Sequence, residues 1–93
     1  MKKILLTALL AASTAAFADS AIERQMQADP NLEQNRARAV QLLEARGYTV
    51  TDIDADDYRG KPAFEVEAVK NGREYDIVLS YPDLTILKEK RDY

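Results

Sequence analysis

The sequence contains no histidine and no cysteine, the side chains on which many enzymes depend. Zinc sites with nitrogen or sulfur ligands, cysteine nucleophiles and histidine-based triads are therefore excluded. Disulfide bonds, the usual reinforcement of small exported domains, are excluded as well. Only three glycines are present and they stand apart, so there is no phosphate-binding glycine loop. These absences predict a protein that is not an enzyme and that has no catalytic residues, no cofactor and no metal ligands.

Basic side chains are also in short supply. The 13 lysines and arginines are outnumbered by 16 acidic residues, which gives a net charge of −3. Binding to a nucleic-acid backbone requires clustered positive charge, so nucleic acid is not expected as a partner. The composition leaves the oligomeric state open.

A long uncharged run occurs only near the beginning of the chain, from Ile4 to Ala12, directly after Lys2 and Lys3. The run is followed by small residues that end in Ala16-Phe17-Ala18, a pattern that signal peptidase cleaves. We therefore expect residues 1–18 to be a secretory signal, with cleavage between Ala18 and Asp19 and a periplasmic or secreted product. An uncleaved anchor is the alternative, but a membrane-spanning helix needs about 20 apolar residues. No stable membrane insertion is expected after cleavage.

Helical patterning follows. Residues 19–31 are expected to form either a short helix or a frayed segment, because Ile22 and Met26 lie four residues apart. Asp29-Pro30 is a helix-start signal, and Gly47 supplies the residue that ends many helices. Between them, from Pro30 to Arg46, the apolar residues recur at helical spacing. They are Leu32, Ala39, Val40 and Leu43.

After Gly47 the apolar period changes to two, which predicts strands. Val50 and Ile53 are out of phase, and a β-bulge near Thr51-Asp52 would return them to one face. The stretch 59–62 is expected to be a turn and 63–70 a second strand. Asn71-Gly72 indicates a two-residue hairpin turn that places three pairs of apolar residues opposite one another. These pairs are Ala68 with Tyr75, Val66 with Ile77, and Phe64 with Leu79.

The third strand is expected to break at Tyr81-Pro82-Asp83, and residues 84–87 could form a short fourth strand before a charged tail, residues 88–93. The order of elements predicts an α+β fold. One main helix would pack on one face of a curled antiparallel sheet of three to four strands, in α-β-β-β order. The domain is expected to occupy residues 32–93.

Acidic residues gather on the predicted strands. Asp52, Asp54 and Asp56 match the first ligand positions of a calcium-binding loop, but Asp57 and Ala63 stand where that loop needs glycine and glutamate. A solvated strand face explains them better. The hairpin register also places like charges opposite each other. The candidate binding face comprises Asp54, Asp56, Glu65, Glu67 and Asp76; the alternative is that Lys88, Lys90 or Arg73 neutralises it.

The chain resembles the PepSY domain family over roughly residues 32–88. The resemblance rests on the stretch from Ala37 to Tyr48, the acidic strand that follows it, residues 63–68, Asn71-Gly72, and residues 75–79. It implies a helix packed on an antiparallel sheet. It also implies regulation or inhibition of peptidases outside the cytoplasm, because PepSY domains occur in metallopeptidase propeptides and as small exported proteins. The family supplies no catalytic residues to carry over.

Two functions follow from this reading. The first is an exported, non-catalytic protein-binding module whose partner is a peptidase. The alternative is an envelope protein that binds a small ligand or a cation on its acidic sheet face.

Overall fold

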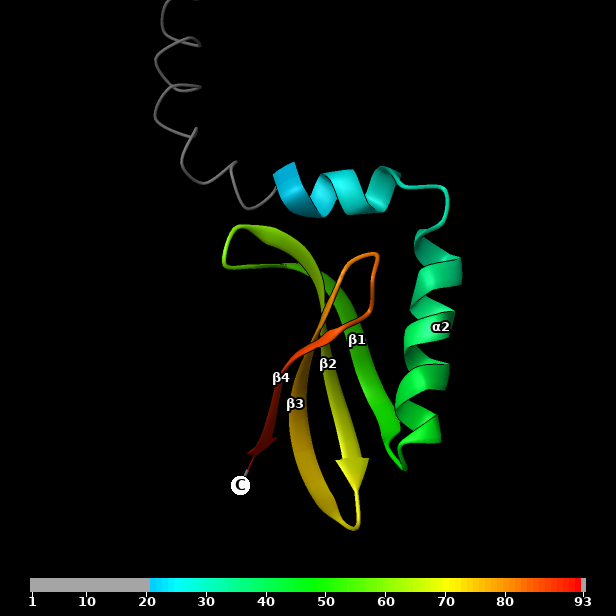
Figure 1. The fold of residues 1–93 in the computed structure, drawn as a ribbon, viewed down its shortest axis with the longest axis vertical. Helices are drawn as coiled ribbons and strands as arrows, with labels where there is room; N and C mark the ends of the chain where they lie inside the picture. The colour runs from blue at the N-terminus through cyan, green and yellow to red at the C-terminus, as the bar shows by residue number, and fades with distance from the viewer. Residues whose placement is uncertain (1–20, 93) are drawn as a thin grey trace, which may run out of the picture.

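The structure is a computed structural model that describes residues 21–92 (Figure 1). A helix over residues 21–28 is followed by a second helix and by an antiparallel sheet whose strands are adjacent in chain order, β1-β2-β3-β4. The elements are α2 (Leu32–Ala45), β1 (Thr49–Tyr58), β2 (Lys61–Lys70), β3 (Arg73–Ser80) and β4 (Ile86–Asp92). The predicted α+β fold is confirmed, with four strands. No helix in the described part of the chain is long and apolar enough to cross a membrane.

The C-terminal end of α2 is built by the residue that the sequence indicated, whereas the helix begins at Leu32, two residues later than the predicted start at Pro30. The Asp29 carboxylate accepts a hydrogen bond from the backbone N–H of Asn31 (2.9 Å), directly before the helix. At the other end Gly47 has a φ of +94°, where a β-carbon is unfavourable. The N–H groups of Gly47 and Tyr48 donate back to the carbonyls of Glu44 and Leu43. This paired arrangement is a Schellman motif, which satisfies the last helical carbonyls.

The N-terminal segment is helical rather than frayed where the structure describes it. The side chain of Met26 is only 2% exposed and belongs to the same core cluster as Leu32 and Leu84. Figure 1 shows this helix crossing the end of the sheet above the strands. The predicted signal and its cleavage site between Ala18 and Asp19 lie outside the described residues, so they stay predictions.

A set of polar contacts joins the residue after this helix and α2 to Tyr81, the residue that follows β3. The Tyr81 hydroxyl donates to the Asp29 carboxylate, and the side-chain amide of Asn35 donates to the Tyr81 oxygen (3.2 Å). Arg38 in turn donates to the Asn35 carbonyl oxygen (3.2 Å). Asn35 is 7% exposed, and the hydrophobic spacing gave no reason to expect it inside. Its burial is acceptable because the amide has partners on both sides.

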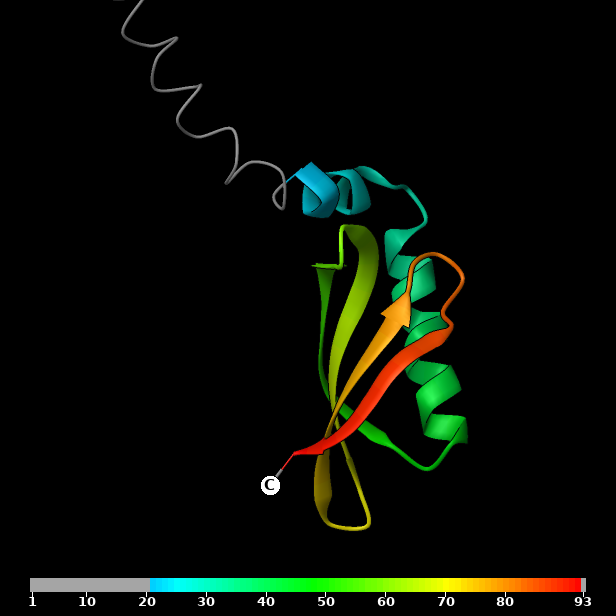
Figure 2. The same cartoon turned by 60° about the vertical axis from the view of Figure 1, so that its left-hand side comes forward.

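The bulge and the hairpin register are confirmed. The pairing of β1 with β2 shifts between Val50 and Asp52, so that Val50, Ile53 and Ala55 all pack against the core. All three predicted pairs of β2 with β3 are observed. The fourth strand differs from the expectation, because β4 begins later than residue 84 and runs through the charged residues 88–92. Pairing with β3 accounts for this, since the hydrogen-bonding groups of the backbone do not depend on side-chain polarity. Figure 2 shows β4 beside β3 along this length.

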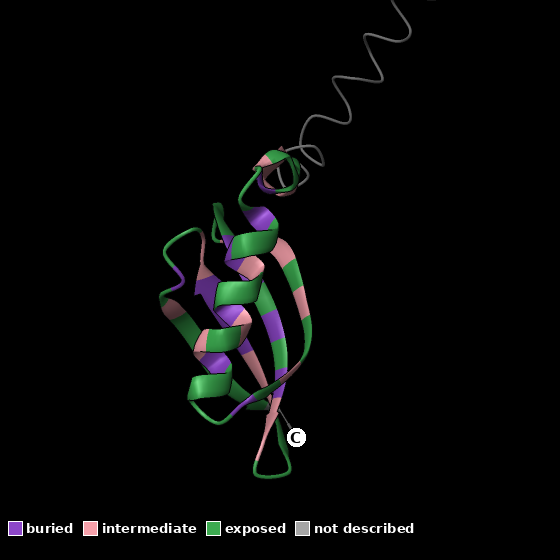
Figure 3. Cartoon of the chain, turned by 90° about the vertical axis from the view of Figure 1, so that its right-hand side faces the viewer, coloured by how far each residue is buried: buried purple, intermediate pink, exposed green. Residues whose placement is uncertain are grey.

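The core lies between α2 and the inner face of the sheet, which is the face that turns toward α2. Figure 3 shows the buried positions of the sheet behind α2. The strand residues of this core are Phe64, Val66, Ala68, Ile77 and Leu79. Among the large side chains, Phe64, Leu43 and Ile77 are fully buried. The opposite, outer face of the sheet is not covered by a helix, and this is where the candidate site lies.

Arg36 of α2 contacts the edge of the sheet. Its guanidinium donates to the backbone carbonyl of Ile53 in β1 (3.3 Å) and lies 3.6 Å from the Glu33 carboxylate. One carbonyl on the β1 edge of the sheet is therefore occupied by a helix side chain, which makes that position a poorer acceptor for an added strand.

Candidate functional site

All five residues of the predicted binding face lie on the outer face of the sheet. Glu67 lies opposite Asp76 across β2 and β3, as predicted, and Glu65 lies opposite Asp54 across β1 and β2. Asp56 is opposite Ala63, which shares the face of Glu65. The pattern of alternating residues was sufficient to bring these carboxylates together, because every second side chain of a strand shares a face. We call this set the acidic face.

Glu65 stands at the centre of the acidic face. Its pKa is raised, first by burial and then by the charges of the other four members of the set, which are Asp56, Asp76, Asp54 and Glu67. A like charge disfavours ionisation of a neighbouring carboxylate, as does removal from water. The electrostatics therefore connect Glu65 to the four other residues of the acidic face.

Asp52 adjoins the acidic face and was omitted from the prediction. It lies opposite Glu67, and a hydrogen bond with it is the largest cause of the raised pKa of Asp54, followed by burial and by the charge of Asp52. Arg36 acts in the opposite direction and lowers this pKa. The signal for Asp52 was present in the sequence, since the predicted bulge puts it on the same face as Asp54 and Asp56.

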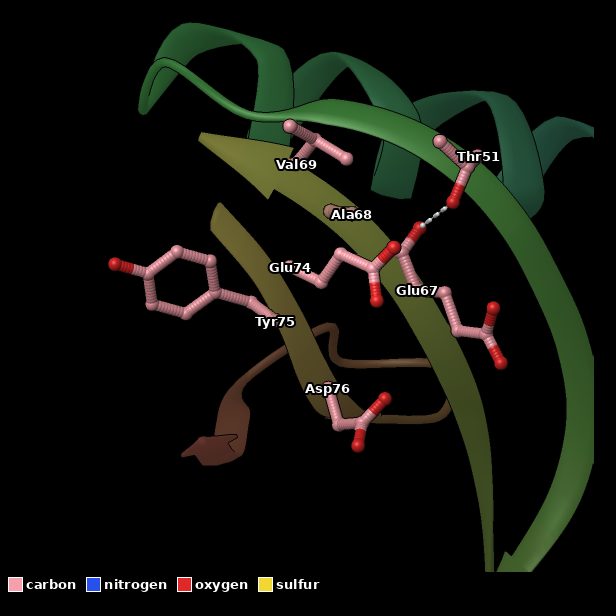
Figure 4. Close-up of a pocket in the computed structure, with 7 residues that line it drawn as sticks. All are labelled: Thr51, Glu67, Ala68, Val69, Glu74, Tyr75 and Asp76. Atoms are coloured by element: carbon pink, nitrogen blue, oxygen red, sulfur yellow. Dashed lines mark hydrogen bonds between the residues drawn. The ribbon is translucent and has the colours of Figure 1, made fainter. Parts of the chain in front are cut away.

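A hollow of about 230 Å³ opens at the hairpin end of this face (Figure 4). Figure 4 shows the carboxylates of Glu67, Glu74 and Asp76 on the same side of the strands, with α2 behind the sheet. At the bulge, the Thr51 hydroxyl donates to the backbone carbonyl of Glu67 (3.1 Å). The bulge thus produces a polar notch between β1 and β2, because the extra residue of a bulge redirects a side chain.

Two lysines border the acidic face on the β4 side. Lys90 is the register partner of Asp76, and Lys88 is the partner of Val78. Arg73, the third predicted neutralising residue, pairs with Lys70 at the hairpin turn. The region between β1 and β2 therefore keeps a concentration of negative charge. Within residues 21–92, no group of three acidic side chains is arranged to hold a metal ion.

Replacing Glu65 with glutamine is expected to stabilise the fold at neutral pH by about 0.2–1 kcal/mol, the scale of a cross-strand pair. The raised pKa means that the folded state binds this proton more tightly than the unfolded state, whose ordinary value is 4.5. The ionised Glu65 carboxylate therefore destabilises the fold fully at pH values above the raised pKa and not at all below pH 4.5. Urea unfolding at several pH values should show the gain disappearing on acidification and shrinking in high salt. Glu44→Gln, on the exposed side of α2, is the control; an equal, pH-independent gain there would contradict the assignment.

A model of the peptidase propeptide and YPEB domain family matches residues 2–90. No curated protein and no solved structure matches the chain. The family match covers both helices and nearly all of the sheet, in agreement with the resemblance read from the sequence. The chain belongs to the peptidase propeptide and YPEB domain family, the PepSY family.

Proposed function

We propose that this protein is an exported, non-catalytic module that binds a peptidase through the outer face of its sheet and regulates it. Membership of the peptidase propeptide and YPEB domain family supports a peptidase as the class of partner. The observation that carries the site is the cluster of five carboxylates on an open sheet face, in which the charges of four surround Glu65 and oppose its ionisation. Repulsion that costs stability is often kept where a surface serves binding.

The proposed partner segment is basic. A positively charged stretch of the peptidase would relieve the repulsion among the carboxylates on contact, and opposite charges would speed the encounter.

Export is part of the proposal and rests on the pattern at Ala16-Phe17-Ala18. Mass spectrometry of the exported protein should find Asp19 as its first residue.

The test asks whether the protein inhibits a thermolysin-like metallopeptidase that is secreted by the same cell. The rate of casein hydrolysis is the measurement. The protein should slow hydrolysis. Glu67→Lys should raise the protein concentration needed for half-maximal inhibition by about tenfold, as expected when a central charge is reversed. Glu44→Lys makes the same charge change on α2 and should leave inhibition unchanged. Unaltered hydrolysis with the wild-type protein, or an equal loss in both variants, would refute the proposal.

The alternative, a small-ligand or cation binder, would use the same carboxylates. Such a ligand would bind in the hollow beside Glu67, Glu74 and Asp76. A rise in melting temperature with calcium or with a polyamine, abolished by Glu67→Lys, would favour this function over a protein partner.

A further inference from the structure

A larger hollow lies at the other end of the sheet, where the β1–β2 turn meets the connection between β3 and β4. Its volume is about 630 Å³, within the range of sites that hold small ligands or peptide segments. We call it the turn-end groove. Its lining residues are Tyr58, Arg59, Lys61, Pro62, Ser80, Tyr81, Asp83, Thr85 and Leu87.

The apolar part of the groove is unusual for this surface. Leu87 is 46% exposed, although the other large aliphatic residues of the strands are largely covered. It stands at the register shift where β4 leaves its regular pairing with β3, between Ile86 and Lys88. A bulge of this kind redirects a side chain. Pro62, also exposed, borders the same groove and has no N–H to offer a ligand.

The polar part of the groove carries opposite charge to the acidic face. Arg59 and Lys61 contribute two cations, and Asp83 contributes one carboxylate, so the rim has an excess of positive charge. The Arg59 guanidinium lies 5.2 Å from the centre of the Tyr58 ring. Stacking on the ring leaves the edge of the guanidinium available, and that edge binds carboxylates with good geometry.

Several backbone groups of the groove are already engaged within the protein. The Ser80 hydroxyl accepts from the N–H of Thr85 (2.9 Å), and the N–H of Tyr81 donates to the Pro62 carbonyl (3.2 Å). A ligand would therefore be recognised by an apolar contact and by the two cations rather than by backbone groups.

We propose that the turn-end groove binds an extended peptide segment of the partner in which a large apolar side chain adjoins an acidic side chain. The apolar side chain contacts Leu87 and Pro62, and the carboxylate pairs with Arg59 and Lys61. This inference rests on the proposed function and names the part of the partner that reaches beyond the acidic face.

The spacing along β2 orders the segment. Glu65 is four residues beyond Lys61, which corresponds to about 13 Å along a strand. A peptide that runs from the groove across the outer face therefore presents its acidic and apolar residues first and basic residues afterwards. The segment has opposite charges at its two ends, as does the sheet face.

The test is an NMR titration of the ¹⁵N-labelled protein with a blocked peptide that carries aspartate and leucine at one end and two lysines at the other. The amide signals of Lys61, Thr85 and Leu87 should shift on binding. Leu87→Ala and Lys61→Glu should each weaken binding by about tenfold, the effect of losing one anchoring contact. Arg73→Glu makes the same charge reversal at the opposite end of the sheet. This variant should bind the peptide as tightly as wild type and show the same shifts of the groove signals.

Three outcomes would overturn the proposal. One is the absence of shifts at the groove, and another is equal binding of a peptide with asparagine in place of aspartate. The third is tighter binding of a peptide whose only carboxylate is a free C-terminus, which would indicate recognition of chain ends instead of a segment. If Glu67→Lys abolishes peptidase inhibition while Leu87→Ala and Lys61→Glu do not affect it, the groove proposal fails and the proposed function stands. If inhibition is absent altogether, the titration still decides the groove.

Discussion

Replacing Leu43 with alanine is expected to destabilise the protein by about 2–5 kcal/mol, enough to leave much of it unfolded. Leu43 is fully buried in the layer between α2 and the sheet. The substitution removes buried apolar surface and leaves a cavity that the surrounding strands cannot fill completely. A domain of this size has roughly 5 kcal/mol of total stability and no disulfide to supplement it. The free energy of unfolding in urea gives the measurement.

Leu87→Ala is the matched control, because it makes the same chemical change at a side chain that is 46% exposed. It should cost less than about 1 kcal/mol, as surface substitutions usually do. If the two variants had equal unfolding midpoints, α2 would not be packed on the sheet as the structure has it. A large loss with Leu87→Ala alone would place the core on the outer face.

Replacing Tyr81 with phenylalanine should cost about 1–3 kcal/mol, the penalty for a buried polar group that loses its partner. The ring and its edge-to-face contact with Phe64 (5.3 Å between centroids) are retained, so only the hydroxyl is tested. Without it, the buried Asn35 amide loses the oxygen to which it donates. The Asp29 carboxylate loses a donor as well, so the connection between the two helices loses its contact with the residue that follows β3. Tyr75→Phe removes a hydroxyl at the other end of the sheet and serves as the control.

The same variant should alter the response to acid. The pKa of Asp29 lies below its ordinary value of 3.8, first because Tyr81 donates to the carboxylate and second because the Asn31 N–H does. A lowered pKa means that the folded state binds the proton less tightly, so the stabilisation is present above 3.8 and is lost as the pH falls through the lowered value. The difference between wild type and Tyr81→Phe should therefore narrow below pH 3.8. If the difference in free energy of unfolding between the two proteins stayed constant from neutral pH to pH 2, the Tyr81 hydroxyl would have no influence on the titration of Asp29.

The acidic face could be predicted because it depends on local rules. Asn71-Gly72 fixes the turn, the turn fixes the register, and the register places Glu67 opposite Asp76. The turn-end groove could not be found in this way. Its two halves, residues 58–62 and 80–87, are separated along the chain and meet only when the sheet is complete.

By itself the sequence determined α2, the bulge, the hairpin and the gathering of carboxylates on one face, since each follows from spacing within a few residues. The tertiary structure decided the rest. Asn35 is buried because Tyr81 brings an oxygen to it from the far side of the core. Met26 is buried because the open end of the core accepts it. The charged residues of β4 form a strand because β3 offers unpaired backbone groups. In all three cases the deciding partner is remote in the chain, and packing there outweighs the local preference of the residue.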